Sequence, residues 1–529
     1  ENGYKLQLQS PVIEKESITG DQIHSGKLVA VYPQHDIINT KWLREKIHLV
    51  KDVIDTIPET LPKDVITEEG FLSRSESIRA LHFPENAEEV EAARNRFAYE
   101  SLYAMQIEAL ERKKEWQGNT QDRLKIPMDA QLIRDFFSSL KFTPTDGQKV
   151  TIFEILQDME KSKPMSRLLE GDVGSGKTLV ATAVIAHTIS HGGQTALMVP
   201  TEVLAKQHVE SIGKVLVGFY NYCQKKGLDI QCPRIALLSG SVPKGQAREI
   251  KESIQAGNID LVIGTHSLIE DSVQFNDLKL VIVDEQHRFG VVQRNRLTSK
   301  GSPHFLSMTA TPIPRTLALT AYGHHDLSVL TEKPGNRSPI DTKVISPADR
   351  KTVELFIDNQ IGEGRQVFVI CPLISESTKE DMTEIKSVEA EFKRLQEGFS
   401  HRRITSLHGK MTPQEKENVM QDFKKNKYDI LVSTSVIEVG IDIPNSTIIV
   451  IEGSERFGLS QLHQFRGRVG RSDIKSYCFL FTTNPEQSRS PRLKAMEKHN
   501  SGFQLAEIDL KLRGPGELFG RRQSGIPEV

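Results

Sequence analysis

The chain has 529 residues, 37% of them hydrophobic and 26% charged, and at ~100–200 residues per domain it should fold as roughly three or four domains. No stretch approaches the ~18 consecutive apolar residues of a membrane-spanning helix, so we expect a soluble protein without a membrane partner. The formal net charge of −2 does not point to a polyanionic partner, and any nucleic-acid binding must come from local basic surface.

The four cysteines argue against both a zinc site and a disulfide framework. They are scattered along the chain, and no two of them form a Cys-x-x-Cys pair. We therefore expect reduced, buried thiols in a cytosolic protein. The residues concerned are Cys223, Cys232, Cys371 and Cys478.

Residues 1–60 are predicted to be the remnant of a small β-domain. Residues 4–8 alternate apolar and polar side chains, and residues 27–32 form a second strand-like run. The chain begins at Glu1 with neither a methionine nor a leader, and it ends at Val529 inside a glycine-rich stretch. We therefore expect a fragment that lacks both natural ends.

A long helix is predicted within residues 61–126, which we interpret as a helical linker. Asn86 is a candidate N-cap, because Glu89 follows three residues later. Apolar side chains then recur at helical spacing from Val90 to Met105.

Two series of short apolar runs beyond residue 127 predict two α/β domains. Runs of this length between helical stretches are typical of buried parallel strands. A segment with proline and glycine, 334–340, separates the two series and indicates two sheets, in domains 127–335 and 336–485. The runs are 196–199, 260–263, 278–283 and 304–308 in the first series, and 366–373, 429–432, 447–451 and 477–481 in the second.

The string Gly-Asp-Val-Gly-Ser-Gly-Lys-Thr predicts an ATP-binding phosphate loop. It follows the apolar pair Leu168–Leu169 and precedes an apolar helix over 179–189. Backbone N–H groups can surround the phosphates, the lysine can reach the β and γ oxygens, and the threonine hydroxyl can bind Mg²⁺. The predicted ATP-binding residues are Gly171, Asp172, Val173, Gly174, Ser175, Gly176, Lys177 and Thr178.

Two adjacent acids, Asp284 and Glu285, follow the apolar run 278–283. The carboxyl ends of strands are where α/β sheets place their ligands. We expect Asp284 to hold Mg²⁺ through water and Glu285 to orient and deprotonate the attacking water. The alternative is a pair of surface acids at the end of a strand.

Arg468 and Arg471 are three residues apart around Gly470, so both can face one side of a helix or tight turn. Two guanidinium groups that reach a γ-phosphate from a second domain would stabilise its developing charge and make hydrolysis depend on domain closure. Alone, such a string is more often solvated surface or a nucleic-acid contact.

Together these motifs resemble those of superfamily 2 helicases and translocases, over roughly residues 140–480. Longer strings at 284–294, 309–320 and 455–464 resemble the RecG family of branched-DNA translocases. The resemblance implies two RecA-like parallel-sheet motor domains. The motifs of the series are Gln148, the phosphate loop, Pro200-Thr201, Gly264-Thr265-His266, Asp284-Glu285-Gln286-His287, Thr309-Ala310-Thr311, Ser433-Thr434, Gly440-x-Asp442 and Gln464 to Arg471.

The resemblance assigns further roles by position. Gln148 corresponds to a glutamine that reads adenine, Gly440 and Asp442 lie near the nucleotide, and Gln464 joins the two arginines at the catalytic site. Other segments would hold the DNA backbone or link hydrolysis to movement. These DNA-binding and coupling residues are Pro200, Thr201, Gly264, Thr265, His266, His287, Thr309, Thr311, Ser433 and Thr434.

Both ends of the chain also resemble RecG proteins. Residues 26–33 and 81–84 resemble the end of an OB-like wedge domain and the linker after it, and 513–525 resembles the TRG motif, a helical hairpin and loop used in translocation. From composition, 513–525 is a flexible loop. The resemblance implies that four residues of the predicted domain 486–529 couple hydrolysis to translocation. These are Arg513, Gly514, Glu517 and Gln523.

The resemblance implies an ATP- and Mg²⁺-dependent helicase that moves on duplex DNA and remodels replication forks and Holliday junctions in recombination and repair. We expect a monomer in the bacterial cytoplasm, associated with the nucleoid, with a single-stranded-DNA-binding protein as a candidate partner. One alternative is a transcription-repair coupling translocase, which would bind polymerase. Another is a junction-binding protein without ATPase activity, which DNA-stimulated hydrolysis would exclude.

Overall fold

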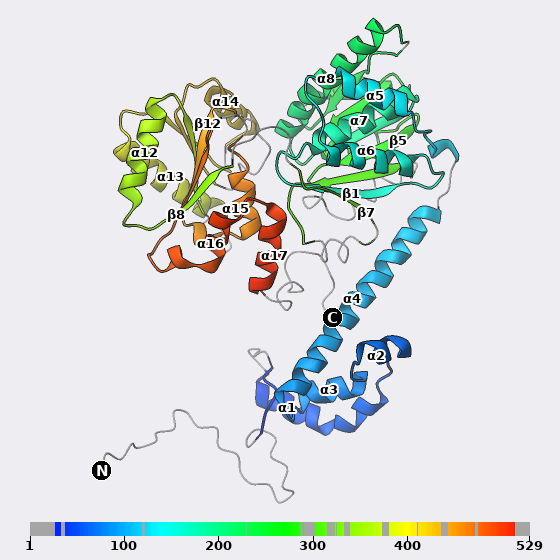
Figure 1. The fold of residues 1–529 in the computed structure, drawn as a ribbon, viewed down its shortest axis with the longest axis vertical. Coiled ribbons are helices and arrows are strands. Elements are labelled where there is room, and N and C mark those ends of the chain that lie inside the picture. The colour runs from blue at the N-terminus through cyan, green and yellow to red at the C-terminus, as the bar shows by residue number, and fades with distance from the viewer. Residues whose placement is uncertain are drawn as a thin grey trace, which may run out of the picture. The chain divides into compact units, whose positions relative to one another are not determined.

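The computed structural model divides the chain into two compact units, Glu1–Glu111 and Arg112–Val529. Figure 1 shows the helices and strands of each. The structure describes residues 27–32, 38–118, 122–228, 230–285, 289, 302–314, 323, 325–332, 339–372, 380–409, 411–434, 443–470 and 474–513.

The described part of the first unit is helical. Its last helix, α4, begins as predicted, because the Asn86 side chain accepts a hydrogen bond from the Glu89 N–H at 2.8 Å. The helix then runs on past the unit boundary. The elements are α1 (Thr40–Leu49), η1 (Lys51–Thr56), α2 (Lys63–Glu69), α3 (Arg74–His82) and α4 (Ala87–Gly118).

The prediction of a strand at 27–32 is wrong, since these residues form no strand in the structure. The carbonyl groups of the segment bond to side chains from α1 instead of to a neighbouring strand. Arg44 donates to the Ala30 carbonyl at 2.9 Å, and Thr40 donates to the Tyr32 carbonyl at 2.8 Å. Residues 4–8 lie outside the described residues, so an OB-like wedge stays a prediction.

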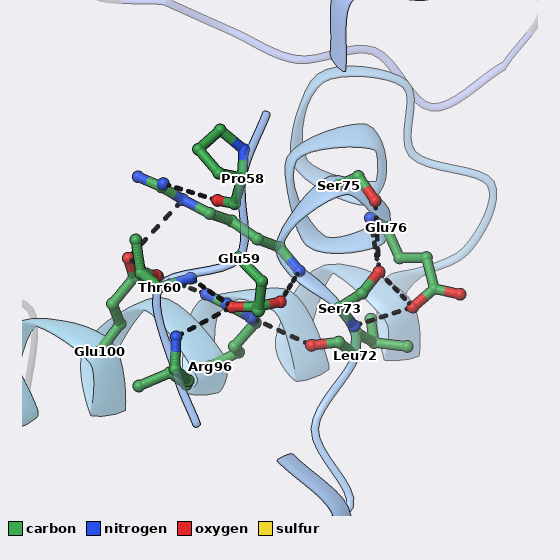
Figure 2. A network of polar contacts seen from close by, with 11 residues as sticks. Pro58, Glu59, Thr60, Leu72, Ser73, Ser75, Glu76, Arg96 and Glu100 are labelled. Carbon is green, nitrogen blue, oxygen red and sulfur yellow. Dashed lines mark hydrogen bonds and ion pairs between the residues drawn. The ribbon is translucent and has the colours of Figure 1, made fainter. Parts of the chain in front are cut away.

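A buried guanidinium group joins α4 to two other segments of the first unit (Figure 2). The Arg96 side chain, on α4, is fully buried and forms ion pairs with Glu59 and Glu100. Its Nε donates to the Leu72 carbonyl at 3.0 Å, and Glu59 also accepts from the Arg74 N–H at 2.8 Å. The network therefore joins the segment before α2, the start of α3 and the middle of α4.

The second unit contains two sheets, both entirely parallel among the described strands, as predicted. The seven strands of the first sheet have the order β3-β4-β2-β5-β6-β1-β7. These strands are β1 (Ser166–Gly171), β2 (Gln194–Met198), β3 (Ile235–Leu238), β4 (Leu261–Gly264), β5 (Leu278–Val283), β6 (His304–Thr309) and β7 (Asp326–Leu330).

Helix α7 forms the centre of the first core, because every residue from Val180 to Thr188 is buried. It packs against β1, β2 and β5 and against α6 and α8. An apolar helix directly after the phosphate loop therefore fixes the loop to the sheet. The helical elements of this part are η2 (Asp122–Leu124), α5 (Ala130–Ser139), α6 (Asp146–Met159), α7 (Lys177–Ser190), α8 (Glu202–Lys225), α9 (Lys244–Gln255) and η3 (His266–Ile269).

The second sheet has six strands in the order β10-β11-β9-β12-β13-β8. The strands are β8 (Asp341–Ile345), β9 (Gln366–Ile370), β10 (Ile404–Leu407), β11 (Ile430–Ser433), β12 (Ser446–Ile451) and β13 (Tyr477–Phe481). The helical elements are α12 (Arg350–Gly362), α13 (Glu380–Gly398), α14 (Pro413–Lys424), η6 (Ser454–Arg456), α15 (Leu459–Arg466), η7 (Gln487–Arg489), α16 (Pro491–Lys498) and α17 (Gly502–Arg513).

Each of the eight predicted apolar runs contains or overlaps a strand, and the two sheets separate between β7 and β8 as predicted. All four cysteines are free, but the expectation of burial is wrong for Cys232, which is exposed because it lies in the irregular segment before β3. Among the described helices, none combines the length and the apolar character needed to cross a membrane.

Candidate active site

The phosphate loop connects β1 to α7 in a conformation that requires glycine. Gly174 and Gly176 have φ angles of 79° and 87°, in the left-handed region that side chains with a Cβ rarely adopt. A Cβ on Gly171 would lie 2.5 Å from Ser175 Oγ. The loop can therefore turn its backbone N–H groups toward an anion at the start of α7.

Lys177, the first residue of α7, lies over this loop. Its ammonium group donates to the Gly171 carbonyl at 2.6 Å and to the Asp172 carbonyl at 3.0 Å. Burial lowers the pKa of Lys177, and the nearby carboxylates, with Glu285 first among them, oppose this shift. The lysine thus places a cation in a mainly acidic environment.

Asp284 follows β5 directly and is held by a residue that sequence reasoning did not find. His208 Nε2, from α8, lies 3.0 Å from Asp284 Oδ2. Burial raises the pKa of Asp284, but the hydrogen bond and charge of His208 and the charge of Lys177 outweigh it, so the net shift is downward. Asp284 is therefore held as a carboxylate.

Glu285 has the properties expected of a proton acceptor. Its φ angle of 51° is unusual for a residue with a side chain. Burial and the neighbouring Asp284 carboxylate raise its pKa, against the opposing charges of Lys177 and Arg468. A carboxyl group with a raised pKa is better suited to take a proton from water at neutral pH.

The donors present suit a magnesium ion that is shared with a nucleotide. Among the described residues no group of three or more His, Cys, Asp and Glu side chains could hold a metal ion. Magnesium, however, usually takes one or two carboxylates and completes its shell with water and phosphate oxygens. The Asp284 carboxylate and the Thr178 hydroxyl at the start of α7 fit that pattern.

Gln148 lies beside the phosphate loop, but its side-chain amide is engaged within the protein. Its Oε1 accepts from the Thr145 N–H at 3.0 Å as part of a capping box, and its Nε2 donates to the Ser175 carbonyl at 2.8 Å. The side chain therefore connects the start of α6 to the loop, and contact with adenine stays a prediction.

Helix α15, which lies between β12 and β13 in the chain, brings residues of the part that contains the second sheet to the phosphate loop. His463 Nε2 forms a hydrogen bond with Asp172 Oδ1, and a Cβ on Gly467 would lie 2.8 Å from Val173 Cβ. Gln464, next to His463, is nearly buried. Arg468 is also nearly buried, and its charge acts on Glu285.

Arg466 fixes the tautomer of His463. A guanidinium donates only, so its 2.9 Å contact makes His463 Nδ1 the acceptor and leaves the proton on Nε2, which faces Asp172. The same guanidinium donates to the carbonyls of Met496 and His499, both at 2.9 Å. His463 and Arg466 lie inside a string that was recognised from the sequence, but nothing there indicated these roles.

The predicted DNA-binding segments of the first sheet lie at the carboxyl ends of its strands. Thr201 caps α8 after β2, and Thr265 and His266 follow β4. Gly264 allows close packing, since a Cβ there would lie 2.1 Å from the Leu238 carbonyl oxygen. Pro200 precedes the capping threonine. The structure thus brings these residues to the ligand-binding edge of a parallel sheet.

Two further predicted segments lie at equivalent strand ends. After β6, Thr309 Oγ1 and Thr311 Oγ1 are 2.6 Å apart. Ser433 ends β11, and Thr434 follows it, both fully buried. The positions outside the described residues are His287, Gly440, Asp442, Arg471, Gly514, Glu517 and Gln523, while Arg513 ends α17 and its side chain is not described.

Comparison with protein families matches three parts of the chain. Residues 145–320 match the DEAD/DEAH box helicase family, and residues 350–473 match the helicase conserved C-terminal domain. Residues 499–527 match the C-terminal part of domain 3 of the ATP-dependent DNA helicase RecG.

The relatives include proteins named ATP-dependent DNA helicase RecG. Those from Synechocystis sp., Streptococcus pneumoniae and Bacillus subtilis are 42%, 43% and 41% identical, over 99%, 97% and 97% of this chain. The chain spans 62%, 75% and 74% of their respective lengths.

A solved structure of a RecG protein also matches the chain. The structure of RecG bound to a three-way DNA junction matches with a TM-score of 0.74 and 37% identity, over 93% of this chain and 63% of that one. A structure of Mss116p bound to single-stranded RNA and AMP-PNP, 19% identical with a TM-score of 0.53, covers 70% of this chain and 75% of that one and shows likeness of fold alone. The chain belongs to the RecG family of ATP-dependent DNA helicases.

Proposed function

We propose that this chain uses ATP hydrolysis to move along duplex DNA and to remodel branched DNA in recombination and repair. The observation that carries the proposal is that residues following strands of the first sheet contact residues of α15 and the turn after it, which belong with the second sheet, at one phosphate loop. His463 bonds to Asp172, and the charge of Arg468 acts on Glu285. Hydrolysis at such a site depends on the closeness of the two motor domains, and that dependence is how chemistry can drive movement.

The positions of the described side chains support the following hydrolytic roles. The loop N–H groups and Lys177 would bind the ATP phosphates, and Glu285 would take a proton from the attacking water. Arg468 would stabilise the charge that develops on the γ-phosphate, together with Arg471 as expected from the sequence. Magnesium held by Thr178 and Asp284 would neutralise phosphate charge when bound.

The family and the strand-end segments support the proposed substrates. One relative was solved with a three-way DNA junction, and the segments after β2 and β4 offer partly exposed polar side chains suited to a phosphate backbone. We extend this proposal to replication forks and Holliday junctions, to a monomer in the bacterial cytoplasm near the nucleoid, and to a single-stranded-DNA-binding protein as partner.

The test measures ATP hydrolysis by this chain with a synthetic fork, linear duplex, single strand and no DNA. Two salt concentrations are needed because phosphate contacts weaken steeply with salt. We expect the fork to stimulate hydrolysis most and high salt to reduce the stimulation. Equal stimulation by plain duplex would leave a translocase without junction preference, and the absence of any stimulation would refute a DNA motor.

A further inference from the structure

Glu170 is a buried acid one residue before the phosphate loop. It lies near the end of β1, paired in register with Thr309 on β6 and Val329 on β7, and it is 1% exposed. Parallel strands that are covered on both faces are normally apolar, and an acid is rarely buried there without a partner. The hydrolytic steps described above do not use this carboxyl group.

The carboxyl group accepts a backbone hydrogen bond from the segment after β6. The Ile313 N–H donates to Glu170 Oε1 at 2.5 Å. Ile313 stands between Pro312 and Pro314, and proline has no N–H. This bond therefore uses the single backbone donor of residues 312–314.

A second carboxylate holds the same segment. The Ala310 N–H donates to Glu285 Oε2 at 3.4 Å, and the Thr311 N–H donates to Thr309 Oγ1 at 3.1 Å. Residues 309–313 are thus fastened on one side to the proposed proton acceptor. On the other side they are fastened to Glu170, whose neighbour Gly171 accepts from Lys177.

We propose that Glu170 is a positioning residue that fastens residues 309–313, which we call the coupling segment, to the phosphate loop. It would transmit movement of the phosphate loop during hydrolysis to this segment, which the family resemblance assigns to linking hydrolysis with movement. Glu170 itself would touch neither ATP nor DNA. The inference rests on the proposed motor function. It concerns the amount of fork remodelling per ATP hydrolysed and not the rate of hydrolysis.

The charge of Glu170 gives this contact a pH dependence. Glu170 Oε2 is buried and has no hydrogen-bond partner among the described residues. Burial raises the pKa of Glu170 to about 7, against the Ile313 N–H and the charge of Lys177. The charge nearest in effect to Glu170 is that of Lys177 on α7, and the charge of Glu285 after β5 acts on the same lysine. The residues paired in register with Glu170 on β6 and β7 are uncharged. Since an ionised acceptor bonds more strongly, coupling should weaken as pH falls through about 7.

The experiment compares Glu170→Ala and Glu170→Gln with the wild-type chain, and uses Glu249→Ala, at an exposed position of α9, as a control for loss of an acid. Fork remodelling per ATP hydrolysed is measured at about pH 6 and about pH 8, on either side of the Glu170 pKa. For Glu170→Ala we expect a loss of about tenfold in remodelling per ATP, as for a lost charged hydrogen bond. Its DNA-stimulated hydrolysis should stay near the wild-type rate.

Glu170→Gln keeps an acceptor oxygen but cannot ionise, so at both pH values its coupling should resemble that of the wild-type chain at about pH 6, without the gain at about pH 8. The inference is overturned if Glu170→Ala reduces hydrolysis and remodelling in equal proportion, or if Glu170→Gln keeps the wild-type pH profile. Should Glu170→Ala fail to fold, the pH profile of Glu170→Gln decides alone. A wild-type chain that hydrolyses ATP without remodelling forks would instead refute the proposed function.

Discussion

The His463 imidazole donates a hydrogen bond from Nε2 to Asp172 Oδ1, between residues that are 291 positions apart in the sequence. Both side chains are almost completely buried. Arg466 holds the other ring nitrogen and also binds the main chain at the end of α16. The phosphate loop is therefore connected through one histidine to the helices that follow the second sheet.

Substitution of this histidine should weaken the ATP site. His463→Ala leaves a buried carboxylate without its donor, and we expect kcat/KM for ATP hydrolysis to fall about tenfold or more. The control is Lys206→Ala, which breaks a second link between the same domains, the ion pair of Lys206 with Glu417. That pair is partly exposed, so its loss should have little effect. Equal losses in the two variants would show that His463 has no special role.

The hydrolytic assignment predicts different defects for two variants. Glu285→Gln removes the proton acceptor and should lower kcat by about 10²–10⁴-fold while ATP still binds. Lys177→Ala should lose turnover and bind nucleotide poorly, because a phosphate contact is gone. Steady-state hydrolysis and the binding of a fluorescent ATP analogue separate the two effects. Normal hydrolysis in either variant would contradict the assignment.

A buried histidine predicts acid sensitivity of the first sheet. His304 Nδ1 accepts from the Met165 N–H at 3.0 Å, and Nε2 lies 2.8 Å from the Leu124 carbonyl. Burial lowers the pKa of His304 from 6.5 to about 4. Between these values the unfolded chain binds a proton that the folded chain does not. The contribution of His304 to the free energy of unfolding is therefore complete above about pH 6.5. It decreases by about 3 kcal/mol as the pH falls to about 4.

Denaturant unfolding across this pH range tests the prediction. His304→Asn should be less stable than the wild-type chain at neutral pH and should lose less stability on acidification. The dependence should be reduced but not abolished, because burial also lowers the pKa of His187 to about 4. The same loss of stability in both chains would mean that His304 does not carry the effect.

The strands that could be predicted from the sequence are those whose faces are both buried. β5 and β12, inside their sheets, are nearly continuous apolar runs. Three of the four edge strands, β7, β8 and β10, lack such a run, because half-buried faces at a sheet edge admit polar side chains. The fourth edge strand, β3, is an apolar run of four residues that was not among the predicted runs. Strand β1 is internal, but Arg167 and Glu170 interrupt its apolar pattern, so only the pair Leu168–Leu169 before the phosphate loop indicated it.

The candidate site divides in the same way. The phosphate loop and the acidic pair have a fixed local spacing, so the sequence alone can indicate them. His208, His463 and Glu170 act through contacts with residues that are distant in sequence, and a single polar residue in a helix or strand gives no local signal. Only the packing of the sheets and helices brings these groups to the loop.

The Arg96 network predicts where the first unit is most sensitive to substitution. Arg96→Met would leave Glu59 and Glu100 facing a buried apolar side chain, and we expect a loss of about 3–5 kcal/mol of stability. The matched control is Arg79→Met, which breaks an ion pair with Asp55 in the same unit. That pair is solvent-exposed, and water replaces its partners at little cost.

Hydrogen exchange of α3 and the first half of α4 measures the effect locally, without requiring that the unit unfold separately from the rest of the chain. Amide protection there should fall in Arg96→Met and stay near wild type in Arg79→Met. Replacing Glu59 and Glu100 by glutamine together with Arg96→Met removes the stranded charges, and it should recover part of the lost protection. If the triple variant is as unprotected as Arg96→Met, the loss comes from packing of the arginine side chain and not from the charges it leaves behind.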